Sequence, residues 1–418
     1  MKKIFRILSI RKHKEVVFAN TYTSDGVRQQ VVFDKKMFLE KPFKKGDCFS
    51  ASCSLSQNNH KEEILKINRV FWISKCFEWD EAKNLPKKSQ NHERYTQSNA
   101  RNAGRQINVY KLKQELIQKI TSLLEKDGFE NTPCKVLEPE RTASAIPPFQ
   151  TQGRYSERPF YLRITTENQL KQTAAILLKS VYSLDNVFYN KNPDARHVPE
   201  MCTLEFVSLT YSKQKLLCFI TKTSRIIDNL SKKYQFETDI PAIPEIINYN
   251  DLPKMGITYQ RRIPEFQNTI LVNVPVDNPF IAPDKNGLRT ETRWYLKGSL
   301  TAHGYVDETK YESVVQALQM QKQNNNLDNV NEMPYFKWGL PKTISFGLGI
   351  DAMICRYLNL ERMSMASNPL GINYVIPDKK RKQENQEDNL LISHQSNNDR
   401  NAAIHAILLN LREKKSEK

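Results

Sequence analysis

The sequence predicts an α+β fold in which a small β-domain precedes a larger domain of strands and helices. Five short apolar runs, each bounded by turn residues, fill the first 80 residues. From about residue 107 to residue 376, amphipathic helical stretches alternate with strands, some of them paired through short loops. The 418 residues provide enough material for two or three domains with a large core.

The net charge of +17 is the most informative total in the composition. Counterion release favours association of such a surface with phosphate backbones, so the charge indicates a nucleic-acid partner. The alternative is a lysine-rich surface that has no such partner. The seven cysteines form no Cys-x-x-Cys pair and the seven histidines no His-x-x-x-His pair, so we expect reduced thiols and no metal site. There is no apolar run of membrane-spanning length, and charges interrupt the opening segment, so we expect a cytoplasmic protein without a membrane partner.

We interpret residues 1–82 as an OB-type barrel, a fold that binds single-stranded nucleic acid on one face. The predicted strands cover residues 4–10, 15–20, 27–33, 47–55 and 63–73. Up to Ser98 the chain holds 20 lysines and arginines against 11 acidic residues, about half of the surplus charge in under a quarter of the length. This concentration of charge supports a nucleic-acid role for the barrel.

The remaining elements follow from periodicity and capping residues. A polar linker at 83–106 precedes an apolar-striped helix at about 109–126, which ends at Asp127-Gly128. A later helix starts near Thr165 or Thr166, either of which is a candidate N-cap. The other predicted elements are a strand pair at 181–188 and 201–211, two or three helical segments in 212–258, strands at 269–275 and within 291–308, a strand–turn–helix at 338–358, and a polar tail at 377–418 with an amphipathic helix at 399–414.

Three segments in order carry a family resemblance. A helix followed by Gly-Phe and Thr-Pro covers about 109–133, the strand pair with its polar loop covers 181–211, and GLGID lies within 338–358. They resemble motifs 1, 2 and 3 of the class II aminoacyl-tRNA synthetases, most closely the lysyl-type enzymes. The resemblance covers residues 1–376 and implies an anticodon-binding barrel, then a catalytic domain at 107–376 with a mainly antiparallel sheet flanked by helices. It also implies a homodimer that binds tRNA.

The same resemblance assigns candidate site residues. The amino-acid pocket candidates are Glu167, Glu205, Tyr305, Asp307 and His303, and the tRNA-binding candidates on the barrel are Arg11, Phe18 and Gln30. Several carboxylates in one pocket would suit a cationic guest. The alternative is that internal salt bridges hold these acids without any ligand.

The nucleotide site departs from the family pattern. Tyr189 stands at the motif 2 arginine, Lys191 at a glutamate, and Ala352 at the motif 3 arginine that follows Asp351. Leu300 stands at a magnesium-binding glutamate. A tyrosine cannot replace a permanently charged, bidentate guanidinium. The other residues of this degenerate site are Arg196, His197, Glu200, Met201 and Arg356.

We therefore predict a lysyl-type paralogue that binds tRNA or aminoacyl-tRNA without conventional ATP-dependent activation and without a cofactor. It would act on a ready-made aminoacyl-tRNA or a cationic amino acid, and whether it is an enzyme stays open. One alternative is a divergent, active ligase that uses ATP and Mg²⁺, with Lys191, Arg196 and Arg356 on the phosphates. Others are a non-enzymatic regulatory or scaffold subunit, and a repurposed amino-acid or metabolite ligase.

Overall fold

The structure is a computed structural model that describes residues 2–23, 27–57, 63–75, 103–139, 147–191, 196–252, 263–320 and 334–369. Most of the predicted linker at 83–106 and the whole predicted tail at 377–418 lie outside the described residues. None of the described helices is long and apolar enough to cross a membrane.

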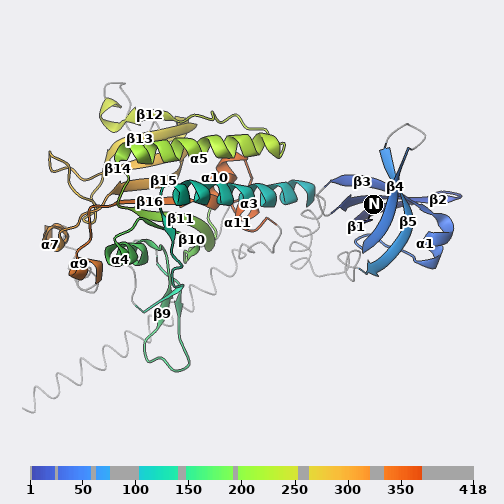
Figure 1. The fold of residues 1–418 in the computed structure, drawn as a ribbon, viewed down its shortest axis with the longest axis horizontal. Coiled ribbons are helices and arrows are strands. Elements are labelled where there is room, and N and C mark those ends of the chain that lie inside the picture. The colour runs from blue at the N-terminus through green and yellow to red at the C-terminus, as the bar shows by residue number, and fades with distance from the viewer. Residues whose placement is uncertain are drawn as a thin grey trace, which may run out of the picture. The chain divides into compact units, whose positions relative to one another are not determined.

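The N-terminal strands close into a barrel in the order β1-β2-β3-β5-β4, which confirms the predicted OB-type fold (Figure 1). Its elements are β1 (Lys2–Lys12), β2 (Val16–Thr23), β3 (Arg28–Asp34), α1 (Lys35–Glu40), β4 (Cys48–Gln57) and β5 (Glu63–Ser74). Alternate side chains on each strand point inward, so aromatic rings fill the centre. The ring of Phe49 lies 5.1 Å from that of Phe5 and 5.4 Å from that of Phe33.

The second domain is built on an eight-stranded sheet in the order β12-β13-β14-β15-β16-β11-β10-β6. Only the outermost pairs, β12 with β13 and β10 with β6, are parallel, so the sheet is mainly antiparallel as predicted. The strands are β6 (Glu130–Asn131), β10 (Val181–Phe188), β11 (Glu200–Ser208), β12 (Glu245–Asn248), β13 (Asn268–Pro275), β14 (Thr290–Leu296), β15 (Ser299–Val306) and β16 (Ile344–Gly349). A small separate sheet contains β7 (Leu137–Glu138), β9 (Phe160–Leu162) and β8 (Gln150–Thr151).

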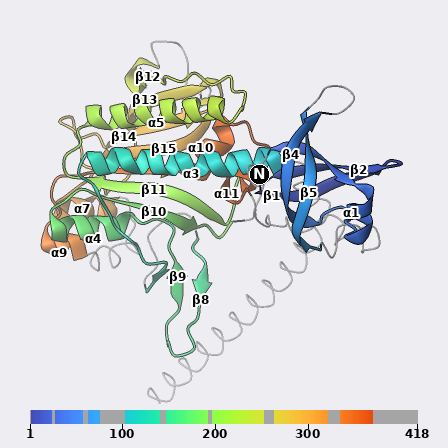
Figure 2. The same cartoon turned by 45° about the vertical axis from the view of Figure 1, so that its right-hand side comes forward.

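The two faces of the sheet have different roles. Helices α3 (Ala103–Lys126) and α5 (Lys213–Lys233) run side by side over one face and enclose the main core (Figures 1 and 2). Helix α4 (Glu167–Leu177) packs Leu170 and Ala174 against Val181 and Val207. Because successive strand residues face opposite ways, Val207 shares its face with Glu205, whereas Phe206 joins the core under α3 and α5.

The remaining described helices are short. They are η2 (Tyr249–Asp251), η4 (Ile263–Glu265), α7 (Tyr311–Met320), α9 (Pro334–Trp338), α10 (Ile350–Tyr357) and α11 (Ser364–Ser367). The strand–turn–helix predicted at 338–358 is present as β16 followed directly by α10, whose N-cap is Gly349.

The prediction of two or three helical segments in 212–258 holds in part, but it missed a strand. The described residues form one long helix, α5, capped by the Ser212 side chain, then the edge strand β12 and the short 3-10 helix η2. Helix α5 ends at Lys233, just before Gln235 takes a left-handed backbone conformation with a φ of 60°, and Pro241 and Pro244 disfavour a new helix beyond it. Ile246 and Ile247 pair in parallel with β13, a partner that local periodicity cannot reveal.

Candidate functional site

A row of polar residues crosses the face of the sheet under α4. Glu205 on β11, Gly347 on β16 and His303 on β15 are cross-strand neighbours, and Ser345 and Tyr305 pair in the same way two residues along. They help to line a cavity of about 260 Å³. Its lining residues are Ile164, Thr165, Glu167, Leu170, Tyr189, Glu205, Phe206, Asn278, His303, Tyr305, Ser345, Phe346 and Gly347.

A fully buried lysine that was not among the predicted pocket residues holds two of the predicted carboxylates. Lys171 Nζ forms ion pairs with Glu167 and with Asp307, the latter at 2.7 Å. Burial opposes the charge of Lys171, but Asp307 and Glu167 outweigh it and raise its pKa well above the usual value. Glu167 and Lys171 are four residues apart on α4, a spacing that places them on one helical face and could have identified the pair.

Asp307 lies behind the cavity lining, whereas Glu167 borders the cavity. Asp307 also accepts hydrogen bonds from Thr343 at 2.8 Å and Ser345 at 2.8 Å, yet burial still raises its pKa. For Glu167, burial is outweighed by Lys171 and by the Tyr305 hydroxyl, which donates at 2.7 Å, so its pKa is lowered. These contacts support the alternative that internal ion pairs and hydrogen bonds neutralise Glu167 and Asp307 without a ligand.

Glu205 ties the start of α4 to the strand pair predicted as motif 2. Its Oε2 accepts from the Thr165 hydroxyl at 2.7 Å, the Thr166 amide at 2.6 Å and the Thr166 hydroxyl at 2.7 Å. Thr166 is the N-cap residue of α4, but its side chain bonds Glu205 and not the helix. Burial raises the pKa of Glu205 although these donors favour the ionised form. Its Oε1 takes part in none of these bonds.

His303 lines the cavity, and one of its ring nitrogens lies close to a carboxylate. Its Nδ1 lies 3.3 Å from Oε2 of Glu291, which also pairs with Arg293 on the same strand. Burial lowers the pKa of His303, but Glu291 outweighs burial and raises it above the usual value of 6.5. Because the folded state binds the proton more tightly than the unfolded state, this contribution to stability is full below pH 6.5 and disappears as pH rises through the folded pKa.

We expect a His303→Gln variant to lose this pH dependence. The difference in unfolding free energy between wild type and variant should shrink as pH rises above 6.5. Urea titrations over a pH series check this, with His13→Gln on the barrel as a control at an exposed position. A difference that grows with pH would contradict the raised pKa.

The predicted nucleotide residues are distributed around this cavity, and only Tyr189 lines it. Burial raises the pKa of Tyr189, so it is neutral at physiological pH. Asp351 is buried and bonded, through Oδ1 to Lys113 Nζ at 2.6 Å and through Oδ2 to the Cys202 amide at 2.8 Å. Ala352 follows at the start of α10, and a Cβ atom on Gly349 would lie 3.3 Å from Ala352 Cβ and 3.8 Å from Met201 Cε.

The other predicted nucleotide residues lie outside the cavity lining. Lys191, Arg196 and His197 are exposed, and Glu200 accepts a hydrogen bond from Asn186 at 2.7 Å. Leu300 is 48% exposed on β15. Arg356, half-buried on α10 one turn beyond Ala352, makes no side-chain hydrogen bond to another described residue.

The charged residues that line the cavity, among those that the structure describes, are two glutamates and one histidine. None of the described residues that line the cavity is a lysine or an arginine, so no fixed cation there faces a phosphate. Within the part of the chain that the structure describes, no three His, Cys, Asp or Glu side chains come together to hold a metal ion.

The barrel candidates lie on one outer face of β1, β2 and β3. Arg11 pairs directly with Phe18, and Gln30 pairs with Asn20, the next outward residue after Phe18 on β2. Arg11 is exposed, and Phe18 and Gln30 are half-buried. An aromatic ring beside a guanidinium and an amide suits a stacked base.

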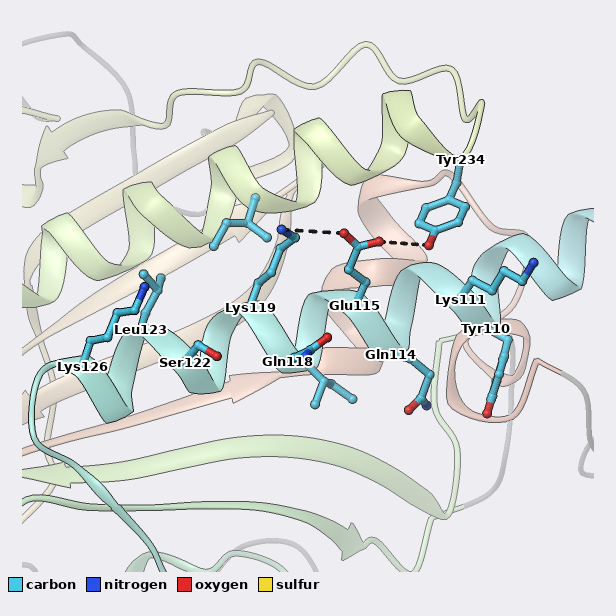
Figure 3. Close-up of a pocket in the computed structure, with 12 residues that line it drawn as sticks. Tyr110, Lys111, Gln114, Glu115, Gln118, Lys119, Ser122, Leu123, Lys126 and Tyr234 are labelled. Atoms are coloured by element: carbon cyan, nitrogen blue, oxygen red, sulfur yellow. Dashed lines mark hydrogen bonds and ion pairs between the residues drawn. The ribbon is translucent and has the colours of Figure 1, made fainter. Parts of the chain in front are cut away.

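A second hollow, of about 950 Å³, runs along α3 beside α5 (Figure 3). Glu115 is bonded to Tyr234 at 3.0 Å and paired with Lys233 at 2.6 Å and Lys119 at 3.6 Å. Figure 3 shows Glu115 between Lys119 and Tyr234, with further side chains of α3 around it. This groove belongs to the segment predicted as motif 1.

The sequence matches the class II tRNA synthetases (D, K and N) over residues 87–367. The chain belongs to this family. Among its relatives are two lysine–tRNA ligases, which show a distant relationship to the lysyl-type members. That of Dehalococcoides mccartyi is 23% identical over 240 residues, which cover 55% of this chain and 47% of the relative. That of Enterococcus faecalis is 26% identical over 250 residues, covering 56% and 48%.

The chain therefore spans about half the length of these curated relatives. Among solved structures, the asparaginyl-tRNA synthetase of Pyrococcus horikoshii, complexed with asparaginyl-adenylate, aligns with a TM-score of 0.69. The alignment covers 87% of this chain and 93% of that chain at 15% identity. This similarity shows that both parts of the class II synthetase fold are present.

Proposed function

We propose that this class II synthetase-family protein binds tRNA or aminoacyl-tRNA and does not activate an amino acid with ATP in the conventional way. The observation that carries the proposal is Tyr189, which lines the cavity at the position where the family resemblance places the motif 2 arginine, with no lysine or arginine among the other described lining residues. Activation develops charge on the α-phosphate, and a fixed cation there stabilises the transition state by several kcal/mol. Tyr189, neutral at physiological pH, provides no such charge.

Support for an aminoacyl guest comes from the cavity that remains. Its volume of about 260 Å³ suits a single amino-acid residue, and Glu205 keeps Oε1 free of the three hydrogen bonds that Oε2 accepts. An α-ammonium group would pair with this carboxylate. We propose that the tRNA part is held by the barrel face of Arg11, Phe18 and Gln30, and that the protein is a homodimer through the motif 1 segment, as the family resemblance implies.

Amino-acid-dependent exchange of pyrophosphate into ATP tests the negative half of this proposal. We expect no exchange with any of the standard amino acids, because each missing cation costs a few kcal/mol in the transition state. An authentic lysine–tRNA ligase under the same conditions is the positive control. Exchange well above background with any one amino acid would overturn the proposal.

The positive half is tested by binding of charged and uncharged tRNA to the full chain. Both should bind more tightly than a generic RNA duplex of the same length. Equal affinity for all three would contradict specific recognition of tRNA.

A divergent ligase is the second candidate, and Arg356 favours it. This half-buried guanidinium lies one helical turn beyond Ala352 and has no hydrogen-bonding partner among the described side chains. If pyrophosphate exchange is found, Arg356→Met should abolish it. An exchange rate that Arg356→Met leaves unchanged would exclude this role for the arginine.

A further inference from the structure

The outer surface of the barrel has a second aromatic feature, away from the face of Arg11, Phe18 and Gln30. Phe71 and Trp72, on β5, are 43% and 44% exposed. Strand residues normally alternate, so two adjacent exposed rings require a local irregularity. The pairing of β4 with β5 provides it: Ser50 pairs with Trp72 and Ala51 with Val70, which leaves Phe71 without a partner. This β-bulge turns both rings outward.

Cations flank these rings. Lys2 Nζ lies 4.8 Å from the centre of the Phe71 ring, and the Arg69 guanidinium carbon lies 5.6 Å from it. Lys2 on β1 and Arg69 on β5 both pair with Ser52, so the two cations lie on either side of strand β4. Ile4, 44% exposed, pairs with Ser50 next to Trp72. We call these five residues, Lys2, Ile4, Arg69, Phe71 and Trp72, the bulge patch.

We infer that the bulge patch is a second binding site for single-stranded RNA, on which unpaired bases stack while Lys2 and Arg69 contact the backbone. The inference rests on the proposed tRNA-binding function and adds a surface to it. Exposed aromatic rings interleaved with cations suit nucleic acid, because every base has a face that can stack and each nucleotide has a charge to neutralise. The patch itself has two cations and no acidic residue, within a strongly basic barrel, so its charge is complementary to that of RNA.

The test measures binding of a short fluorescent single-stranded RNA, and of tRNA, to the full-length protein. The variant Phe71→Ala/Trp72→Ala should weaken binding of the short RNA about tenfold or more, since base–aromatic stacking contributes about 1–3 kcal/mol per base. Leu55→Ala is the matched control, because Leu55 is a 69% exposed apolar residue on the adjacent strand β4. Phe71→Tyr/Trp72→Phe keeps two stacking rings and should retain wild-type affinity.

A second pair of substitutions tests the ionic part without removing rings. Lys2→Gln/Arg69→Gln should reduce the magnitude of the negative slope of log affinity against log salt by about 1.4, as expected for two lost contacts with a single strand. Wild-type affinity in the double alanine variant, or a loss that Leu55→Ala shares, would overturn the inference. So would a change in self-association of the double alanine variant with unaltered RNA binding, which would indicate a protein contact.

The outcome also separates this inference from the proposed function. If Phe18→Ala weakens tRNA binding while Phe71→Ala/Trp72→Ala weakens binding of neither RNA, the bulge patch is excluded and the proposed function remains. If the wild-type protein binds neither RNA, both fail.

Discussion

Replacing Lys171 with methionine should lower the free energy of unfolding by about 3–5 kcal/mol, the usual result of removing one partner from a buried ion pair. Lys171 is 2% exposed and Asp307 is fully buried, so no water would replace the lost ammonium group at Asp307. Asp307 would keep hydrogen bonds from Thr343 and Ser345, but these do not neutralise its charge. Chemical denaturation at neutral pH measures the loss.

The matched control is Lys233→Met. Lys233 also pairs with a glutamate, Glu115, but it is 56% exposed, so its removal should change stability far less. The double variant Lys171→Met/Asp307→Asn should recover part of the loss, because it removes the uncompensated charge as well. A Lys171→Met variant as stable as wild type would show that Asp307 and Glu167 do not depend on the lysine.

Replacing Glu205 with glutamine should reduce affinity for aminoacyl-tRNA about tenfold or more and leave affinity for uncharged tRNA unchanged. Hydrogen bonds to charged groups contribute about 1.5–3 kcal/mol, and the substitution removes the charge that an α-ammonium group would contact. The glutamine oxygen can still accept from Thr165 and Thr166, so the start of α4 should remain in place. Binding measurements with matched charged and uncharged tRNA give the ratio.

Blocking the ammonium group on the ligand provides an independent check. Acetylation of the aminoacyl nitrogen should remove the difference between wild type and Glu205→Gln. Glu130→Gln, at an exposed ion pair with Lys179, controls for the loss of one negative charge. If Glu205→Gln binds both tRNA forms as wild type does, the regulatory or scaffold alternative is favoured.

Local patterns predicted most of the fold. All five barrel strands, the strand pair of β10 and β11, and the passage from β16 to α10 follow from alternation and periodicity within short windows. Helix α3 begins at Ala103, earlier than the predicted start near Val109. The prediction missed these first turns because they carry few apolar residues. Strand β12 was missed because its pairing with β13 crosses more than twenty residues of sequence.

The site was less predictable, because its contacts join residues far apart in the chain. Glu167, Glu205, His303 and Tyr305 were identified through a family resemblance and do line one cavity. The sequence did not indicate that Lys171 links Glu167 to Asp307. Nor did it indicate that Glu291 orients His303, since that pair depends on the register between β14 and β15.

The lack of a side chain at Gly347 keeps open the space between Glu205 and His303 in the cavity. A Cβ atom at this position would lie 3.8 Å from His303 Nε2 and 3.9 Å from Glu205 Cγ. Alanine would fit at ordinary contact distance, but a longer side chain would occupy the space between the acid and the imidazole. A single substitution at Gly347 can therefore narrow the cavity between Glu205 and His303, so an evolving lineage could restrict this space while its fold stays intact.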